Sequence, residues 1–209
     1  MSNKGPSPKT AGIILAAGLS RRMGRPKQLL PVGGVSLICR ILGEALSSRL
    51  DWIVVVLGYE AEQMQRLLAK EYPGQEYEIV FNDKYREGMA SSIRAGIDLI
   101  KKDYDHAMII LADMVHIDAP LINRLLKIYL ASGESLGAVT IKGRRSHPVI
   151  FSRDLYPELL GLKGDKGGRD LFIAHEKEAC LVPAPPEYRE IDIDTPEDYR
   201  RLISLKNYP

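Results

Sequence analysis

A group of cations follows the first apolar segment of the chain and has no acidic residue near it in sequence. Residues 13–16 form an apolar run typical of a buried strand, and the chain then breaks into a loop rich in glycine. The loop carries four cations, Arg21, Arg22, Arg25 and Lys27. No Asp or Glu precedes Glu44. These cations therefore predict a site for an anionic ligand, for which phosphate is the natural candidate.

The same loop has the small residues that close contact with phosphate requires. At Gly18 no side chain hinders the approach of the backbone N–H groups to phosphate oxygens. The loop is not a Walker A sequence, because Gln28 follows Lys27 where that motif has Ser or Thr. The spacing of Gly18 and Gly24 also excludes the G-x-G-x-x-G dinucleotide fingerprint. A different kind of phosphate loop is therefore expected.

Two aspartates are candidates for a metal site. Asp113 follows the predicted strand at 107–111, at the strand end where open α/β sheets bind ligands. Asp194 ends a predicted edge strand at 191–194, but it also suits a turn or a helix cap. Magnesium is usually held by one or two carboxylates together with phosphate oxygens and water. The pair therefore predicts a Mg2+ site, with Asp113 the stronger candidate.

A helix beginning near residue 89 opens with two serines, for which two interpretations remain open. Ser91 or Ser92 caps the helix, which is a common role of serine at such a position. Alternatively, the hydroxyls and free N–H groups of the helix start face a ligand.

The elements that would position these residues alternate between strand and helix. Apolar runs and helical periodicity predict strands at 13–16, 52–57, 77–81 and 107–111, and helices at 35–46, 61–70, 89–97 and 118–130. This order is typical of an α/β fold with a mostly parallel sheet. Further strands are predicted at 136–141, 148–151 and 181–183, with helices at 153–160, after 169 and after Thr195.

Length and composition indicate one cytoplasmic domain. The 209 residues suit a single core at 11–209 preceded by a flexible tail at 1–10. A net charge of only +2 argues against nucleic acid as a partner, and no run approaches the ~18 apolar residues that cross a membrane. Cys39 and Cys180 lie far apart and outside any metal-ligand spacing, which favours reduced thiols.

Several motifs in order resemble those of a known family. They occupy residues 15–27, 88–92, 112–114, 147–148, 164–167 and 193–198. The set is similar to the molybdenum cofactor cytidylyltransferase branch of the MobA-like nucleotidyltransferases, close to the molybdopterin guanylyltransferases. The resemblance implies a single-domain, Rossmann-like, three-layer fold with a mostly parallel central sheet and a small β extension on the acceptor side.

The resemblance also implies an activity and its residues. CMP would pass from CTP to the phosphate of molybdopterin with release of pyrophosphate, assisted by Mg2+ on Asp113 and Asp194. Arg22 and Lys27 would hold the triphosphate and, with Asp113, would be the catalytic residues. The implied nucleotide-binding residues are Leu15, Ala16, Ala17, Gly18, Ser20, Arg22, Lys27, Gly58, Ser91 and Ser92. The implied acceptor-binding residues are His147 and Arg169, although an ordinary exposed histidine and a helix cap are equally simple interpretations.

An alternative remains open for the nucleotide base, for the acceptor and for the activity itself. The pair Ala16-Ala17 replaces the Ala-Gly-Gly commoner in guanylyltransferases and favours cytidine, but GTP remains the alternative base. Val115, Ser146 and Gly168 depart from the family pattern and put the acceptor in question, so a sugar phosphate is an alternative acceptor. A third interpretation is a non-catalytic protein that carries finished molybdenum cofactor to a molybdenum hydroxylase apoenzyme.

Overall fold

The computed structural model describes residues 7–165, 168–191 and 193–204. The strands are β1 (Thr10–Ala16), β2 (Pro31–Val32), β3 (Val35–Ser36), β4 (Trp52–Leu57), β5 (Glu78–Phe81), β6 (His106–Leu111), β7 (Leu136–Ile141), β8 (Arg144–Ser152) and β9 (Ala179–Pro183). The α-helices are α1 (Leu37–Leu46), α2 (Ala61–Glu71), α3 (Met89–Ile100), α4 (Ala119–Ser132), α5 (Tyr156–Leu160), α6 (Arg169–Ala174) and α7 (Pro196–Ser204). Short 3-10 helices lie at Lys27–Leu29, Tyr85–Glu87, Arg153–Leu155 and Glu176–Glu178.

Seven strands form one sheet in the order β5-β4-β1-β6-β8-β7-β9. β1 lies between β4 and β6 and is parallel to both, and all seven of its residues are buried. β8 runs antiparallel to β6 and to β7, whereas β9 is parallel to β7. This is the single α/β domain with a mostly parallel sheet that the sequence predicts. The strands β8, β7 and β9 continue the central sheet beyond β6.

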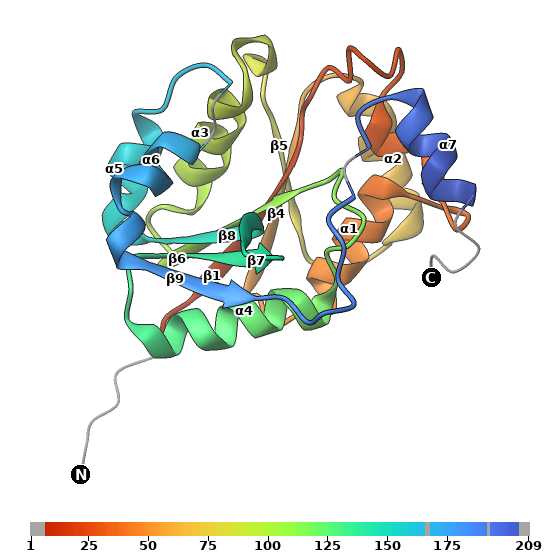
Figure 1. Ribbon diagram of the computed structural model, residues 1–209. Helices are drawn as coiled ribbons and strands as arrows, with labels where there is room; N and C mark the ends of the chain where they lie inside the picture. The colour runs from red at the N-terminus through yellow and green to blue at the C-terminus, as the bar shows by residue number, and fades with distance from the viewer. Residues whose placement is uncertain (1–6, 166–167, 192, 205–209) are drawn as a thin grey trace.

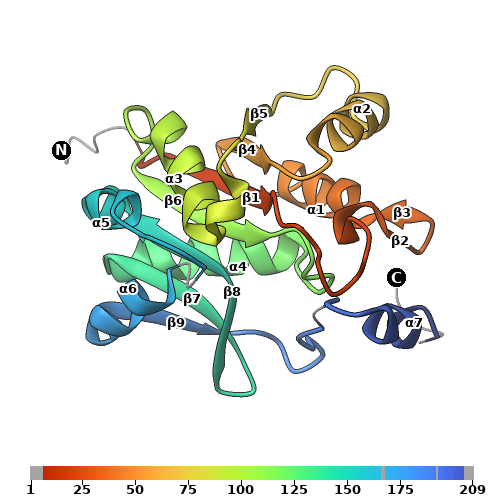
Figure 2. The ribbon, with the colours of Figure 1, turned by 90° about the horizontal axis from the view of Figure 1, so that it is seen from above.

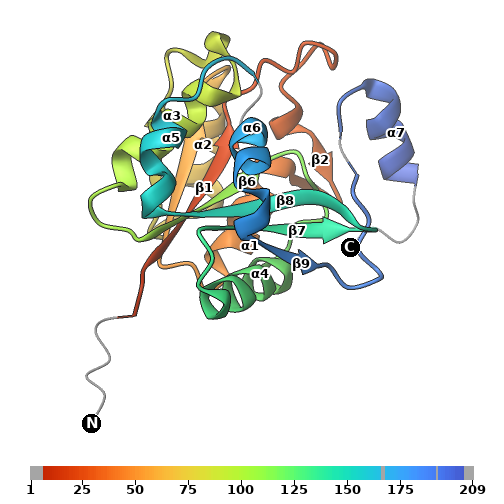
Figure 3. The same cartoon turned by 60° about the vertical axis from the view of Figure 1, so that its left-hand side comes forward.

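Helices cover both faces of this sheet. Figures 1 and 3 show α3, α5 and α6 on one face and α1, α2 and α4 on the other. Alternate residues of β1 enter the two cores: Ile14 packs with α1, α2 and α4, whereas Ile13 packs with α3 and α5. Both faces of a central parallel strand are apolar because both are covered.

A third, smaller apolar cluster joins the opening loop to the end of the chain. It contains Met23, Leu30, Val32, Leu37, Val115, Ile193 and Leu202. Figure 2 shows α7 apart from the sheet, on the side of α1 and the β2–β3 hairpin. Tyr199 of α7 donates a hydrogen bond of 2.6 Å to the carbonyl oxygen of Pro31. These contacts hold the segment before α7 beside the opening loop.

Three local predictions differ from the structure. β1 begins at Thr10, inside the segment assigned to the tail, whereas residues 1–6 lie outside the described part. The predicted edge strand at 191–194 is wrong for Ile191, Ile193 and Asp194, which lie in irregular chain, while residue 192 is outside the described residues. β8 begins at Arg144, so most of the predicted loop at 142–148 is strand.

Candidate active site

The opening loop lines a cavity of about 600 Å3 at the carboxyl end of the parallel strands. The cavity lies between the chain that leaves β1 and the chain that leaves β6, where the strand order changes direction. Ligands of open α/β sheets bind at such a reversal. Its lining residues come from four parts of the chain: 15–28, 85–92, 111–113 and 164–165, together with Asp194.

Lys27 lies at the centre of a charge network in this cavity. Its Nζ donates a hydrogen bond to Oδ2 of Asp113 and another, of 3.2 Å, to Oδ1 of Asp194. The second carboxylate oxygen of Asp194 accepts a hydrogen bond of 2.8 Å from Arg22. The structure thus brings together Arg22, Lys27, Asp113 and Asp194, which the sequence separates by up to 172 positions.

The members of this network differ in their exposure to solvent. The Arg22 side chain is 70% exposed, whereas those of Lys27 and Asp113 are 15% and 20% exposed. Burial alone lowers the pKa of Lys27, but the charge and hydrogen bonds of Asp113 and Asp194 outweigh it and raise the pKa above its ordinary value. Lys27 is therefore a fixed positive charge, and Arg22 is a cation accessible from solvent.

Ser20 shapes the opening loop. Its Oγ accepts a hydrogen bond of 3.0 Å from the backbone N–H of Lys27, and its carbonyl oxygen accepts from Met23 and Gly24. Its φ of 50° lies in the left-handed region, which is unusual for a residue with a side chain. Backbone strain of this kind tends to occur where a loop must hold a functional geometry. Ser20 also lines the cavity, so it is placed both to order the loop and to meet a ligand.

The other predicted nucleotide-binding residues divide between the cavity wall and the core. Leu15, Ala17 and Gly18 line the cavity. A Cβ atom at Gly18 would meet only Gln28 Nε2, at 3.7 Å, so packing within the protein does not require glycine there. Ala16 is fully buried in β1 and does not line the cavity. Gly58 also lies outside the lining, and a Cβ there would come within 2.8 Å of the Ala17 Cβ.

The start of α3 differs from the prediction of free N–H groups facing a ligand. The backbone N–H of Met89 donates to Oδ1 of Asp165 at 3.1 Å, and that of Ala90 donates to the carbonyl oxygen of Gly164 at 3.1 Å. A distant loop therefore caps this helix. Ser91 Oγ donates to the Gly88 carbonyl oxygen and does not line the cavity, whereas Ser92 does.

The buried side chain of Asn82 holds Ser91 and Ser92 through hydrogen bonds to their hydroxyl groups. Its Nδ2 donates hydrogen bonds of 2.8 Å to Ser91 Oγ and 3.0 Å to Ser92 Oγ, and its Oδ1 accepts from the backbone of Lys84. Asn82 is 6% exposed. It therefore positions Ser92 at the cavity without lining it.

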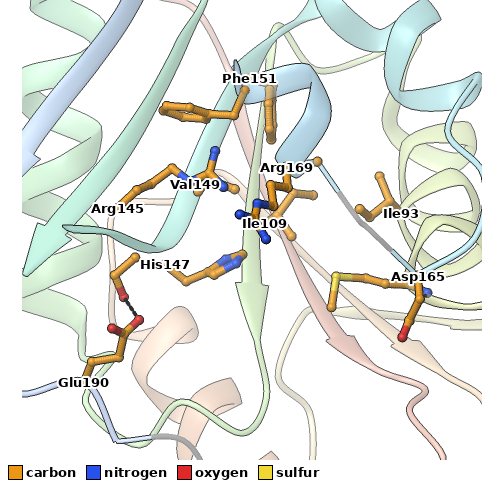
Figure 4. A pocket seen from close by; sticks show the side chains of 13 residues that line it. Ile93, Ile109, Arg145, His147, Val149, Phe151, Asp165, Arg169 and Glu190 are labelled. Atoms are coloured by element: carbon orange, nitrogen blue, oxygen red, sulfur yellow. Dashed lines mark hydrogen bonds between the residues drawn. The ribbon is translucent and has the colours of Figure 1, made fainter. Parts of the chain in front are cut away.

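A second pocket, of about 220 Å3, contains both predicted acceptor residues. His147 and Arg169 line it together with apolar side chains of β6, β8, α3 and α6 (Figure 4). Met89 and Asp165 line both pockets, so the second pocket adjoins the first.

His147 is an uncharged group in this second pocket at neutral pH. Its Nδ1 is buried and has no hydrogen-bond partner among the described residues. Burial lowers the pKa of His147 to about 4, although the Ile109 backbone, Asp113 and Glu190 oppose that shift. The ring therefore offers a polar atom that no protein group uses.

The site offers a metal ion two carboxylates. No group of three or more His, Cys, Asp or Glu side chains suited to a metal occurs in the described part of the chain. Asp113 and Asp194 nevertheless direct one oxygen each at the same cation, Lys27 Nζ. Two carboxylates completed by substrate phosphates and water are a donor set that fits magnesium.

Comparison with known proteins decides the family. The model of the MobA-like NTP transferase domain matches residues 12–179. The chain belongs to this family. The matched segment contains the opening loop, Asp113 and the whole second half of the sheet as far as the start of β9. Asp194 lies beyond it.

Relatives of the same length carry different names. The purine catabolism protein PucB of Bacillus subtilis is 33% identical over 206 residues, which cover 95% of this chain and 99% of that protein. Nicotine blue oxidoreductase of Paenarthrobacter nicotinovorans is 30% identical, with 94% and 97% covered. Molybdenum cofactor cytidylyltransferase of Escherichia coli is 25% identical, with 90% and 92% covered.

A solved structure shares the whole fold. Rv0371c of Mycobacterium tuberculosis is 26% identical and superposes with a TM-score of 0.82 over 96% of this chain and 100% of its own. Rv0371c has also been solved in complex with manganese.

Several cavity residues were not predicted. Gln28, Tyr85, Arg86 and Asp165 line the larger cavity, and Arg145 lines the smaller one. Gln28 is a polar residue with 3% exposure, and its position directly after Lys27 was an available signal. Tyr85 and Arg86 form a cation–π pair in the loop before α3, which only the folded chain brings to the cavity. Among the described residues, no helix is long and apolar enough to span a membrane.

Proposed function

We propose that this protein transfers CMP from CTP to the phosphate of molybdopterin and releases pyrophosphate. The observation that carries the proposal is the convergence of two cations and two carboxylates, Arg22, Lys27, Asp113 and Asp194, at the strand-order reversal. Membership in the MobA-like NTP transferase family supports the reaction type. The relative named molybdenum cofactor cytidylyltransferase supports this base and acceptor, whereas the names of PucB and nicotine blue oxidoreductase specify neither.

The chain's own groups supply the positioning and charge neutralisation that phosphoryl chemistry needs. The acceptor phosphate and the nucleotide are both anions, so their encounter requires fixed positive charge. The carboxylates of Asp113 and Asp194 fix the position of the Lys27 ammonium group, and Arg22 provides a second, solvent-exposed cation. Gly18 leaves its backbone open to phosphate oxygens, and Ser20 holds the loop in register with Lys27. A phosphate monoester already carries the attacking oxygen, so the reaction needs no general base.

A divalent cation would be held by Asp113 and Asp194. When bound, such an ion neutralises charge on the phosphate oxygens and on the pyrophosphate leaving group. The carboxylates that now pair with Lys27 and Arg22 would then face the metal, and the two cations would be released toward the phosphates. We assign Mg2+ on the oxygen-only donor set, and the manganese complex of Rv0371c supports a divalent ion in a protein of this fold.

Cytosine is the base we assign. Ala17 lines the cavity next to Leu15, and the Ala16-Ala17 pair supports cytidine. A relative named molybdenum cofactor guanylyltransferase matches over only 22% of this chain, although at 49% identity.

A nucleotide panel tests the proposal. Pyrophosphate release is followed with CTP, GTP, ATP and UTP, with and without molybdopterin, in the presence of Mg2+. Release that requires both CTP and molybdopterin supports the assignment. Release with GTP but not CTP would overturn the base, and release with CTP and a sugar phosphate alone would overturn the acceptor. Tight molybdopterin binding without turnover on any nucleotide would indicate a carrier.

A further inference from the structure

The side-chain amide of Asn82 is held in one orientation by its hydrogen-bond partners. The backbone N–H of Lys84, which can only donate, lies 3.0 Å from Oδ1 of Asn82. The reversed amide would place Nδ2 against that N–H, so two donors would meet at a residue that is 6% exposed. Nδ2 therefore faces Ser91 and Ser92 and donates to both hydroxyl oxygens, at 2.8 and 3.0 Å.

This orientation fixes the direction of the hydrogen bonds at both serines. Because each hydroxyl oxygen accepts from Asn82, each hydroxyl has its own hydrogen left to donate. Ser91 donates that hydrogen to the carbonyl oxygen of Gly88, at 2.8 Å. Ser92 differs, because no residue in the described part of the chain accepts a hydrogen bond from its hydroxyl. Ser92 is 5% exposed and lines the larger cavity, so its hydrogen is available to a ligand there.

The backbone of Asn82 fixes this arrangement to the sheet. Its N–H donates a hydrogen bond of 2.8 Å to the carbonyl oxygen of Leu57, the last residue of β4. Its carbonyl oxygen accepts a hydrogen bond of 3.2 Å from the backbone N–H of Tyr85. With side chain and backbone both bonded, Asn82 has little freedom to turn. The Ser92 donor is therefore preorganised before any ligand binds.

The α3 side of the cavity suits an uncharged part of a nucleotide. The charge network around Lys27 includes Asp194, next to α7, and Figures 1 and 2 show α3 and α7 on opposite sides of the opening loop. On the α3 side, two carboxylates, Glu87 and Asp165, line the cavity beside a single cation, Arg86. The N–H groups at the start of α3 are already bonded to a neighbouring loop. A triphosphate is therefore favoured beside Lys27, which places the nucleoside beside α3.

We propose that Ser92 donates a hydrogen bond to the nucleoside of the bound nucleotide and that Asn82 is the positioning residue that makes Ser92 a donor. The partner atom is a hydrogen-bond acceptor of the base or of the ribose. This inference rests on the proposed function, because it takes a nucleoside triphosphate as the ligand of the larger cavity. It gives Asn82 a role in nucleotide binding without contact with the nucleotide.

Binding without turnover tests the inference. CTP and inorganic triphosphate are titrated separately into the full-length protein with Mg2+, and calorimetry gives each affinity. The ratio of the two affinities reports the nucleoside contribution and cancels a general effect of charge. Ser92→Ala removes the donor. Asn82→Asp keeps an acceptor for Lys84 but cannot donate, so the Ser92 hydrogen turns toward the carboxylate and away from the cavity.

Both single variants should bind the nucleoside part more weakly. We expect each to lower the ratio of CTP to triphosphate affinity about fivefold, the usual effect of one hydrogen bond. The double variant should fall no further than Ser92→Ala, because Asn82 acts through Ser92. Asn123→Asp on α4 is the matched control, since Asn123 also accepts from a backbone N–H and lines neither pocket. It should keep the wild-type ratio.

The outcomes separate this inference from the proposed function. A wild-type ratio in Ser92→Ala, or an Asn82→Asp effect that keeps its full size when Ser92 is already alanine, would overturn the inference. A wild type that binds CTP no more tightly than triphosphate would also overturn it. Failure of the nucleotide panel, with an Asn82 effect that depends on Ser92, would overturn the reaction and leave this inference standing. Transfer in the panel with unchanged ratios in both variants would do the reverse.

Two further arms complete the experiment. Thermal unfolding reports whether each variant is folded, and Asn82→Ser replaces Asn82→Asp if the latter is not. A serine there still accepts from the backbone N–H two residues on, but it is shorter and lacks the amide donor. A loss in Ser92→Ala that is equal for CTP and 2′-deoxy-CTP assigns the acceptor atom to the base. A loss with CTP alone assigns it to the ribose, and either result supports the inference.

Discussion

Lys27 shows how a residue predicted from the sequence acquires its environment only in the fold. The absence of acidic residues before Glu44 indicated cations free for a ligand. In the structure, Asp113 and Asp194 pair with Lys27 from 86 and 167 positions away. The same carboxylates are the candidate metal ligands. The absence of acidic residues near the loop therefore correctly indicated that no local carboxylate pairs with Lys27. Its carboxylate partners come from distant segments of the chain.

Replacing Lys27 tests its role in the transition state. Lys27→Met removes a preorganised cation, for which the typical loss of about 2.7–4 kcal/mol corresponds to a 100- to 1,000-fold lower kcat. The rate of pyrophosphate release measures it, and thermal unfolding reports whether the protein remains folded. Lys127→Met, on the exposed face of α4, is the matched control and should leave kcat unchanged. A Lys27→Met enzyme with kcat within twofold of the wild type would remove Lys27 from the mechanism.

We expect the buried, neutral ring of His147 to make the stability of the folded protein depend on pH. Burial, and to a lesser extent the charge of Arg145, lowers the pKa of His147 to about 4 in the folded protein, against an ordinary value of 6.5, although the Ile109 backbone, Asp113 and Glu190 oppose that shift. The unfolded chain therefore takes up the proton first, and stability falls as the pH decreases from 6.5 toward 4. At pH 5 this amounts to about 2 kcal/mol relative to pH 7.5.

Denaturant unfolding of the wild type and of His147→Gln at several pH values measures this effect. The wild type should lose about 2 kcal/mol more than the variant between pH 7.5 and 5, since glutamine does not titrate. Parallel pH profiles for the two proteins would show that His147 is not buried as a neutral ring.

At the scale of elements, apolar strands were predictable and irregular segments were not. The runs that became β1, β4 and β6 are buried on both faces, and continuous apolar sequence reports this directly. The alternation of isoleucine and aspartate at 191–194 also resembles a strand. In the structure Ile193 is fully buried in the third apolar cluster without strand pairing. A period of two indicates one buried side and says nothing of a partner strand.

The start of β8 was missed because its residues are poor strand formers. Arg144, Arg145, His147 and Pro148 suggested a loop, but β7 pairs with Arg144 and Arg145 and, after a register shift, again with Val149. With the strand unrecognised, the position of Arg145 in the same pocket as His147 could not be predicted. The capping of α3 by Gly164 and Asp165 escaped for a similar reason, since nothing local to residue 89 indicates a distant loop.

The helix α7 connects the third apolar cluster to Asp194, so we expect damage to that cluster to affect the active site. Leu202 is 1% exposed in the third cluster, and Asp194 lies two positions before the first residue of α7. Leu202→Ala creates a cavity that typically costs about 2–5 kcal/mol and should loosen the docking of α7. We expect a lower unfolding midpoint and a higher Mg2+ concentration for half-maximal activity.

A neighbouring residue provides the control for α7. Ile203 is 56% exposed on the same helix, so Ile203→Ala should change neither quantity. Pyrophosphate release across a magnesium series, combined with thermal unfolding, measures both effects. An unchanged magnesium requirement in a destabilised Leu202→Ala protein would show that α7 does not position Asp194.

For the whole molecule, the fold and the larger cavity were more predictable than the smaller pocket. Parallel strands that end at one edge bring the loop after β1 and Asp113 together, so sequence order alone suggested that meeting. The smaller pocket is assembled from β6, β8, α3 and α6, whose relative placement no local pattern encodes. Relatives matching over nearly the whole chain carry different names, and a shared fold does not fix an acceptor.

Tracing labelled phosphorus tests nucleotidyl transfer most directly. The protein, Mg2+ and molybdopterin are incubated with CTP labelled at either the α- or the γ-phosphorus, and the products are separated. The account predicts that α-label appears in the molybdopterin product and that γ-label appears only in pyrophosphate. Gamma-label on molybdopterin, or α-label confined to free CMP, would contradict nucleotidyl transfer by this site.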